Sequence, residues 1–230
     1  MPDRYVKVVP VTMTVPVVPV ISITIGLSLL LWVLFPIMSF VLFYVPQGIV
    51  TPLADDAVVL AAPPDRTQDF SKASTWFPQN PAKKTVTPVD TYTLTIPKLR
   101  IKNAIVKIGT DDLSKNLIHY GGTGLPGQPG NTVIFGHSVL PSFYNPKDYL
   151  TIFSLLPTLK EGNDIYIRFD GVDYRYKVVS QRITEPEDVS GLEQQYDDSY
   201  ITLVTCVPPG TYWKRLWLVA QEQPFGEATP

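Results

Sequence analysis

A lone cysteine and an arginine flank a short loop near the end of the chain. Cys206, the only cysteine in the sequence, follows the β-branched and aromatic run 200–205, and Pro208–Gly210 then force a turn. Arg215 opens a second apolar run, 216–220. If the two runs pair as antiparallel strands, the guanidinium comes close to the sulfur, and a nearby cation lowers the pKa of a thiol. The pattern therefore predicts a nucleophilic thiolate.

A histidine also stands at the end of a predicted strand. The sequence contains two histidines, and His137 closes the apolar run 131–137. A thiolate, a histidine and an arginine suffice for acyl transfer. The thiolate attacks a carbonyl, the histidine exchanges protons with the leaving and incoming groups, and the arginine stabilises the oxyanion. The plainer interpretation of Cys206 is a small buried hydrophobic residue.

The N-terminal part of the chain predicts a membrane anchor. No charged residue occurs between Lys7 and Asp55, and residues 21–45 are long and apolar enough to cross a bilayer as a helix. Arg4 and Lys7 precede this span, so the positive-inside rule places residues 1–20 in the cytoplasm and the rest of the chain outside it. We therefore expect a single-pass protein of the cell membrane. A cleaved signal peptide is the alternative.

Two further regions follow the span. Residues 46–88 mix Pro, Ala, Asp, Ser, Gln and Thr with little periodicity, which is typical of an extracytoplasmic stalk. Trp76 and Phe77 could mark a piece of it that packs back on the domain. Residues 89–225 are expected to form the folded domain.

That domain is predicted to be mainly β, with short helices. Asp170-Gly171 is a strong β-hairpin signal, and helical structure is expected only in short stretches such as 149–159. The predicted strands are 91–96, 99–108, 131–137, 164–169, 174–180, 200–206 and 215–220. Many short strands with closely spaced turns argue for a closed β-barrel.

Composition and motifs exclude several function classes. The formal net charge of −2 gives no basic footprint of the kind that nucleic-acid binders have. The glycine-rich stretch 119–130 lacks the spacing of phosphate-binding loops and is interpreted as a tight irregular loop. No metal-ligating cluster and no cofactor are predicted. Glu185, Glu187 and Asp188 would allow calcium binding, but solvated acidic residues are the simpler interpretation.

Two motifs resemble those of the sortases. T-L-V-T-C at 202–206 is similar to the T-L-x-T-C signature of that family, Arg215 lies at the family's spacing after it, and 119–137 is similar to the segment that leads into the family's catalytic histidine. By this resemblance Cys206 is the nucleophile, His137 the catalytic histidine and Arg215 the oxyanion-stabilising residue.

The resemblance also implies three substrate-binding residues, Thr205, Leu203 and His119. Thr205 is similar to the family threonine beside the cysteine. His119 matches an auxiliary histidine of the family, and the alternative for it is a loop histidine that is hydrogen-bonded to the backbone.

The resemblance implies an eight-stranded barrel that acts as a membrane-anchored cysteine transpeptidase. Sortases cut a sorting signal similar to L-P-x-T-G between threonine and glycine, and then pass the acyl group to an amine of a cell-wall precursor or a pilin lysine. The loop after Cys206, V-P-P-G-T, is more like the class D and E branches, and no Asp-Pro-aromatic lid motif is found upstream. Surface-protein anchoring is therefore favoured over pilus assembly.

Two other functions stay open. An L,D-transpeptidase is another exported acyl-transfer enzyme with histidine and cysteine, although its cysteine usually lies in an S-x-G-C context that 203–206 does not match. A non-enzymatic anchored β-barrel that binds a ligand would make Cys206 a core residue. A thiol reagent separates these cases, because an accessible thiol of low pKa reacts rapidly near neutral pH and a core thiol resists.

Overall fold

The structure is a computed structural model that describes residues 17–43, 69–85, 87 and 89–224. The chain divides into two compact units, Met1–Phe43 and Tyr44–Pro230. Residues 46–68 of the predicted stalk lie outside the described residues.

The described part of the first unit is a helix, α1, Val17–Phe43. The hydroxyls of Ser22, Thr24 and Ser28 donate hydrogen bonds to carbonyls of the preceding turn, so these polar groups are satisfied within the helix. The segment Val18–Phe35 is long and apolar enough to cross a membrane. An apolar helix therefore covers most of the predicted span 21–45 and begins four residues before it.

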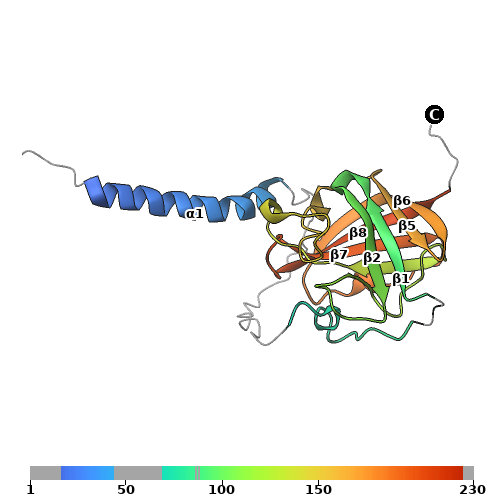
Figure 1. The fold of residues 1–230 in the computed structure, drawn as a ribbon. Helices are drawn as coiled ribbons and strands as arrows, with labels where there is room; N and C mark the ends of the chain where they lie inside the picture. The colour runs from blue at the N-terminus through green and yellow to red at the C-terminus, as the bar shows by residue number, and fades with distance from the viewer. Residues whose placement is uncertain (1–16, 44–68, 86, 88, 225–230) are drawn as a thin grey trace, which may run out of the picture. The chain divides into compact units, whose positions relative to one another are not determined.

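The second unit contains eight strands that close into a barrel (Figure 1). The strands are β1 Thr91–Ile96, β2 Ile101–Ile108, β3 Leu117–His119, β4 Gly130–Phe135, β5 Asp164–Phe169, β6 Val172–Thr184, β7 Ser199–Val207 and β8 Lys214–Gln223. Their order around the barrel is β1-β2-β3-β4-β7-β8-β6-β5, and β5 pairs with β1 to close it. The pairs β2–β3 and β4–β7 are parallel and the others are antiparallel. The predicted closed, mainly β barrel is confirmed.

Among the described residues of this unit, helical structure is limited to short 3-10 turns. They are Ala73–Thr75, Pro97–Leu99, Pro141–Phe143, Leu156–Thr158 and Ser190–Leu192. The helix expected over 149–159 shrinks to one such turn, because Pro157 has no N–H to continue an α-helical ladder. The β5–β6 hairpin turns at Asp170-Gly171 as predicted, with φ angles of 49° and 79°.

Strand alternation gives β7 an inner and an outer side. Leu203 and Thr205 lie on one side with Ile201, all fully buried, and the Thr205 hydroxyl donates to the Gly136 carbonyl at 2.8 Å. Val204 and Cys206 lie on the other side, in a cluster with aromatic residues from outside the barrel. The cysteine therefore belongs to the outer face of the barrel and not to its interior core.

Candidate active site

Cys206 and Arg215 are opposed residues of the antiparallel β7–β8 pair. Directly opposed residues of such a pair point to the same side of the sheet, so sulfur and guanidinium share the outer face. The Arg215 Nη1 donates to the carbonyls of Tyr212 and Lys214 at 3.1 and 3.4 Å. These two carbonyls hold the guanidinium in place, and the predicted antiparallel pairing of the two strands is confirmed.

His137 follows β4, the parallel neighbour of β7. The residues on either side of it are bonded to β7: the Gly136 N–H donates to the Val204 carbonyl at 3.1 Å, and the Ser138 hydroxyl donates to the Cys206 carbonyl at 2.7 Å. His137 therefore stands beside the strand end that carries the cysteine. His137 Nε2 and Arg215 Nε are buried without a hydrogen-bond partner among the described residues, so both are free to serve a reacting group.

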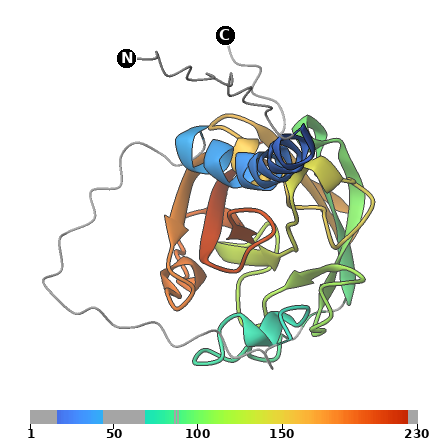
Figure 2. The ribbon, with the colours of Figure 1, turned by 90° about the vertical axis from the view of Figure 1, so that its left-hand side faces the viewer.

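A segment before the barrel covers this site. Residues 69–80, which we call the arm, lie against the outside of the barrel (Figure 2). The ring of Trp76 lies with its centroid 6.1 Å from that of His137 and 5.1 Å from the Arg215 Cζ, a cation–π contact. Trp76 and Cys206 are each 2% exposed and share one cluster. The arm therefore seals the sulfur from solvent.

Aromatic stacking holds the arm on the outer face. Phe70 stacks on Tyr212 of the β7–β8 loop at 4.3 Å between ring centroids, and Phe77 stacks on Trp217 of β8 at 5.5 Å. Each such pair stabilises the contact beyond the area that it buries. Trp76 packs in the same way on Phe135 of β4.

Hydrogen bonds tie the arm to the segment between β2 and β3. Ser74 donates from its N–H and its hydroxyl to the Asp111 carboxylate, at 2.6 and 2.7 Å. Backbone bonds join Ala73 to Asp111 and Ser71 to Leu113. The packed region of this unit thus begins before residue 89, because two aromatic side chains interrupt the polar stretch that predicted a stalk.

Comparison with known proteins assigns the chain to a family. A family model for the sortase domain matches residues 94–223. The chain belongs to the sortase family. Sortase D of Bacillus subtilis (strain 168) is 29% identical over 117 residues, which are 50% of this chain and 53% of that protein, so the chain spans about half the length of this relative.

Solved sortase structures share the barrel. Sortase A from Corynebacterium diphtheriae superposes with a TM-score of 0.53 at 29% identity, over 63% of this chain and 66% of that one. Sortase C-1 from Actinomyces oris gives a TM-score of 0.52 at 28% identity, over 61% of this chain and 76% of that one.

Burial dominates the electrostatics of the covered site in this sortase. Burial raises the pKa of the Cys206 thiol to about 11, against the smaller lowering effect of Arg215. Burial also lowers the pKa of His137, while the carboxylates of Asp112 and Asp69 act in the opposite direction. The expected low-pKa thiol is therefore wrong for the covered state, in which thiol and imidazole are both neutral at neutral pH.

The structure brings three of the six predicted site residues together and places the other three elsewhere. Leu203 and Thr205 lie on the inner side of β7, away from Cys206. His119 ends β3, is 1% exposed, and has its Nδ1 hydrogen-bonded to the Tyr92 hydroxyl at 3.0 Å. These placements offer no direct contact with a substrate on the outer face. Trp76, which sequence reasoning did not place at the site, contacts it instead.

Two of the three acidic residues considered for calcium have other partners. Glu185 forms an ion pair with Lys214 at 2.8 Å, and the Asp188 carboxylate accepts hydrogen bonds from the N–H and hydroxyl of Ser190. Among the described residues, no group of three or more His, Cys, Asp or Glu is placed to hold a metal ion.

His119 is expected to make the barrel sensitive to mild acid. Burial lowers its pKa from 6.5 to about 4. Between these pH values, His119 is protonated in the unfolded chain and neutral in the folded chain. The free energy of unfolding therefore falls as the pH drops from about 6.5 to 4, by up to about 3 kcal/mol. Urea unfolding of the full chain across this range should show the loss, and His119→Gln should flatten it. An unchanged slope in that variant would assign the effect to other groups.

Proposed function

We propose that this sortase is a cysteine transpeptidase at the cell surface. It cleaves a sorting signal similar to L-P-x-T-G through a thioacyl intermediate on Cys206 and transfers the protein to an amine, from a cell-wall precursor or a lysine side chain. One observation carries the proposal: Cys206, Arg215 and His137 converge at neighbouring strand ends on one outer face of the barrel. Class D and E enzymes, with a role in surface-protein anchoring, are the favoured branch.

The chemistry follows from the groups at the strand ends. His137 takes the proton of the Cys206 thiol as the sulfur attacks the carbonyl carbon of the threonine–glycine bond, and the negative charge on the carbonyl oxygen faces the Arg215 guanidinium. His137 protonates the leaving glycine amine as the C–N bond breaks, which leaves a thioester. The acceptor amine then attacks the thioester, His137 takes its proton, and the thiolate leaves.

The donor peptide has to displace the arm before this chemistry begins. Beneath the arm, the outer face presents Phe135, Val204 and Trp217, all fully buried while the arm is closed. When the arm moves away, these side chains form an apolar floor that leads to Cys206, which we call the donor groove. An apolar floor suits the leucine and proline of a sorting signal, because burying apolar surface stabilises the complex.

Helix α1 supports a location at the membrane. Its composition suits a single membrane crossing, and the basic residues before it favour a cytoplasmic N-terminus with the barrel outside. The membrane is thus one partner of the chain, and surface proteins with a sorting signal and an amine acceptor are the others.

The test is direct capture of the acyl-enzyme. The full chain in detergent micelles is incubated with a library of sorting-signal peptides, and mass spectrometry follows the mass added to Cys206. An adduct that equals the peptide up to its threonine, and that an added amine releases, supports transpeptidation. No adduct with any peptide, in a protein whose thiol reacts with iodoacetamide under the same conditions, would exclude the proposal.

Arg215→Lys is expected to lower the acylation rate about 10- to 100-fold with little change in peptide affinity. Lysine keeps the charge but lacks the planar fork of donors, and the contact matters most when the oxyanion forms. Single-turnover kinetics measure the rate and melting curves check the fold. Arg168→Lys is the matched control, because Arg168 of β5 is an exposed arginine in an ion pair with Asp173, and β5 pairs with neither β7 nor β8. Near-normal acylation by the Arg215 variant would rule out the oxyanion role.

A further inference from the structure

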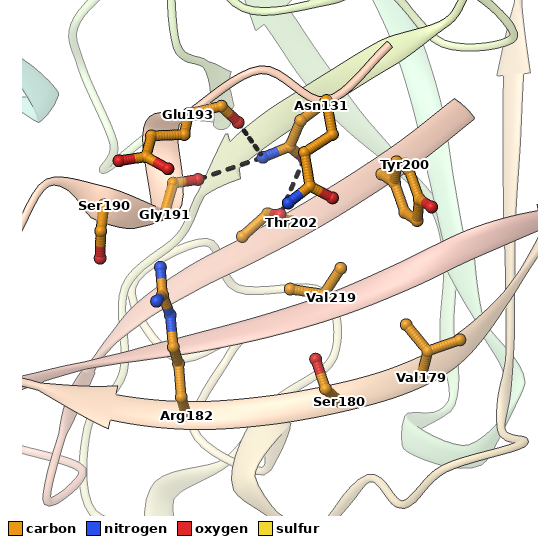
Figure 3. A pocket seen from close by; sticks show the side chains of 11 residues that line it. Asn131, Val179, Ser180, Arg182, Ser190, Gly191, Glu193, Tyr200, Thr202 and Val219 are labelled. Atoms are coloured by element: carbon orange, nitrogen blue, oxygen red, sulfur yellow. Dashed lines mark hydrogen bonds between the residues drawn. The ribbon is translucent and has the colours of Figure 1, made fainter. Parts of the chain in front are cut away.

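The loop between β6 and β7, residues 185–198, is fastened to β4 by a buried asparagine. The Asn131 side chain, 7% exposed, donates from Nδ2 to the carbonyls of Gly191 and Glu193 at 3.1 and 3.4 Å. Its Oδ1 accepts a hydrogen bond from the Thr202 hydroxyl of β7 at 2.8 Å. Figure 3 shows this side chain between the loop and the strand. One amide thus joins two strands and the loop.

A second amide, Gln194, completes the fastening from the loop side. Its Oε1 accepts from the backbone N–H groups of Gly124 and Asn131 at 3.1 and 3.0 Å. Its Nε2 donates to the carbonyls of Asn131 and Leu192, each at 3.1 Å. Between them, the two side chains use all four amide hydrogens and both carbonyl oxygens, and buried networks with every member satisfied hold a single geometry. We call Asn131 and Gln194 the amide clamp.

The far side of the loop does not provide comparable packing. A pocket of about 340 Å³ lies between the loop and the outer surfaces of β6, β7 and β8. Figure 3 shows Ser190, Gly191 and Glu193 on one side of this pocket, with Arg182 and Val219 across it. The amide clamp thus adds to the attachment of the loop on the side where this pocket separates part of it from the sheet.

The amide clamp sets where the loop meets the donor groove. Gly191 lies directly on the ring of Trp217, where an added Cβ would come within 2.0 Å of a ring atom. The next residue, Leu192, is 8% exposed and belongs to the same cluster as Cys206, and Val189 packs against that cluster. Leu192 and Val189 therefore form a wall of the donor groove.

We propose that Asn131 and Gln194 are positioning residues that hold the β6–β7 loop as a preformed wall of the donor groove, without help from a bound metal ion. The inference rests on the proposed function, because the wall matters only if a donor peptide occupies the groove. Neither residue touches the reacting atoms. Their effect is on donor binding, through Leu192 and Val189.

Two isosteric variants test the amide clamp. Asn131→Asp and Gln194→Glu keep the size and the acceptor oxygens but remove the N–H donors to the loop and strand carbonyls. Hydrogen exchange of the full chain in detergent micelles should speed up about tenfold or more at residues 189–194, because each lost bond leaves a carbonyl unpaired. In peptide turnover, KM should rise about tenfold while kcat changes less than twofold.

The matched control is Gln195→Glu, the same substitution one residue further along the loop. Gln195 is exposed, and among the described residues its side chain makes no hydrogen bond. It should leave exchange and KM unchanged. Calcium added at ~5 mM, or the chelator EDTA at the same concentration, should leave hydrogen exchange at residues 189–194 unchanged in the unsubstituted chain.

Several outcomes would overturn the proposal. These are unchanged exchange in both clamp variants, a fall in kcat at constant KM, an equal effect of Gln195→Glu, or calcium-dependent protection of the loop. Exchange is measured without substrate. If the chain turns over no peptide at all, the proposed function fails while the exchange result still decides whether the amide clamp holds the loop.

Discussion

Cys206→Ala is expected to lower cleavage of a sorting-signal peptide by at least about 10⁴-fold, because loss of the nucleophile leaves only binding and charge stabilisation to assist the reaction. The fold should survive. The sulfur lies on the outer face beneath the arm, and its removal leaves a small gap that costs on the order of 1 kcal/mol of unfolding free energy. Turnover is measured by chromatography of the cleaved peptide, and stability by thermal melting.

The same experiment distinguishes a catalytic cysteine from an incidental one. His119→Gln is a useful comparison, because His119 belongs to the barrel interior and should change stability more than turnover. If the alanine variant retained more than about one part in a hundred of the activity, another nucleophile would be at work. If the alanine variant melted at a much lower temperature than the parent, the main role of Cys206 would be structural.

Opening the arm should raise the reactivity of Cys206 about a hundredfold. Replacing Trp76 and Phe77 together by alanine removes the rings that bury the sulfur. The thiol pKa should then fall from about 11 towards its ordinary value of 9.0 or below. At pH 7.5, below both values, the thiolate fraction grows tenfold for each unit by which the pKa falls, so two units give about a hundredfold. Solvent access adds to this effect.

Iodoacetamide labelling measures this change without background, since the chain has one cysteine. The labelling rate is recorded from pH 6 to 10, and an inflection should fall within this range only in the double variant, because the parent thiol has a pKa of about 11. Trp213→Ala is the control, because Trp213 is also aromatic and lies near the site but is 61% exposed and outside the arm. Equal labelling rates in the parent and the double variant would mean that the arm does not limit access.

The three proposed catalytic residues could be selected from the sequence because each lies where a predicted strand meets a loop. Cys206, His137 and Arg215 sit in patterns that local sequence reveals, and register then brings them together. The same alternation along the strand also indicates that neither Thr205 nor Leu203 shares a face with Cys206, yet motif similarity assigned both to substrate.

The cover over the site was harder to predict for a physical reason. Residues 69–80 have no helical or strand periodicity, and their order comes from tertiary contacts such as Trp76 on Phe135 and Ser74 on Asp111. Propensity and pattern carry no information about such contacts. The raised pKa of Cys206 could not be predicted from local sequence for the same reason, because the shift comes mainly from burial by a segment about 130 residues away in the chain. The three-residue strand β3 was missed because it is shorter than any pattern window.

The arm has a consequence for which proteins this enzyme would serve. A site that is open for only a fraction of the time binds every donor more weakly by that fraction, so an open population of one in a hundred weakens apparent affinity a hundredfold. Dilute or poorly matched peptides then fail to compete with the arm, which is part of the same chain and always present at the site. A donor confined to the same membrane meets the enzyme at a high local concentration and passes this threshold. The contacts of Trp76 with His137 and Arg215 would thus favour substrates that are retained at the membrane.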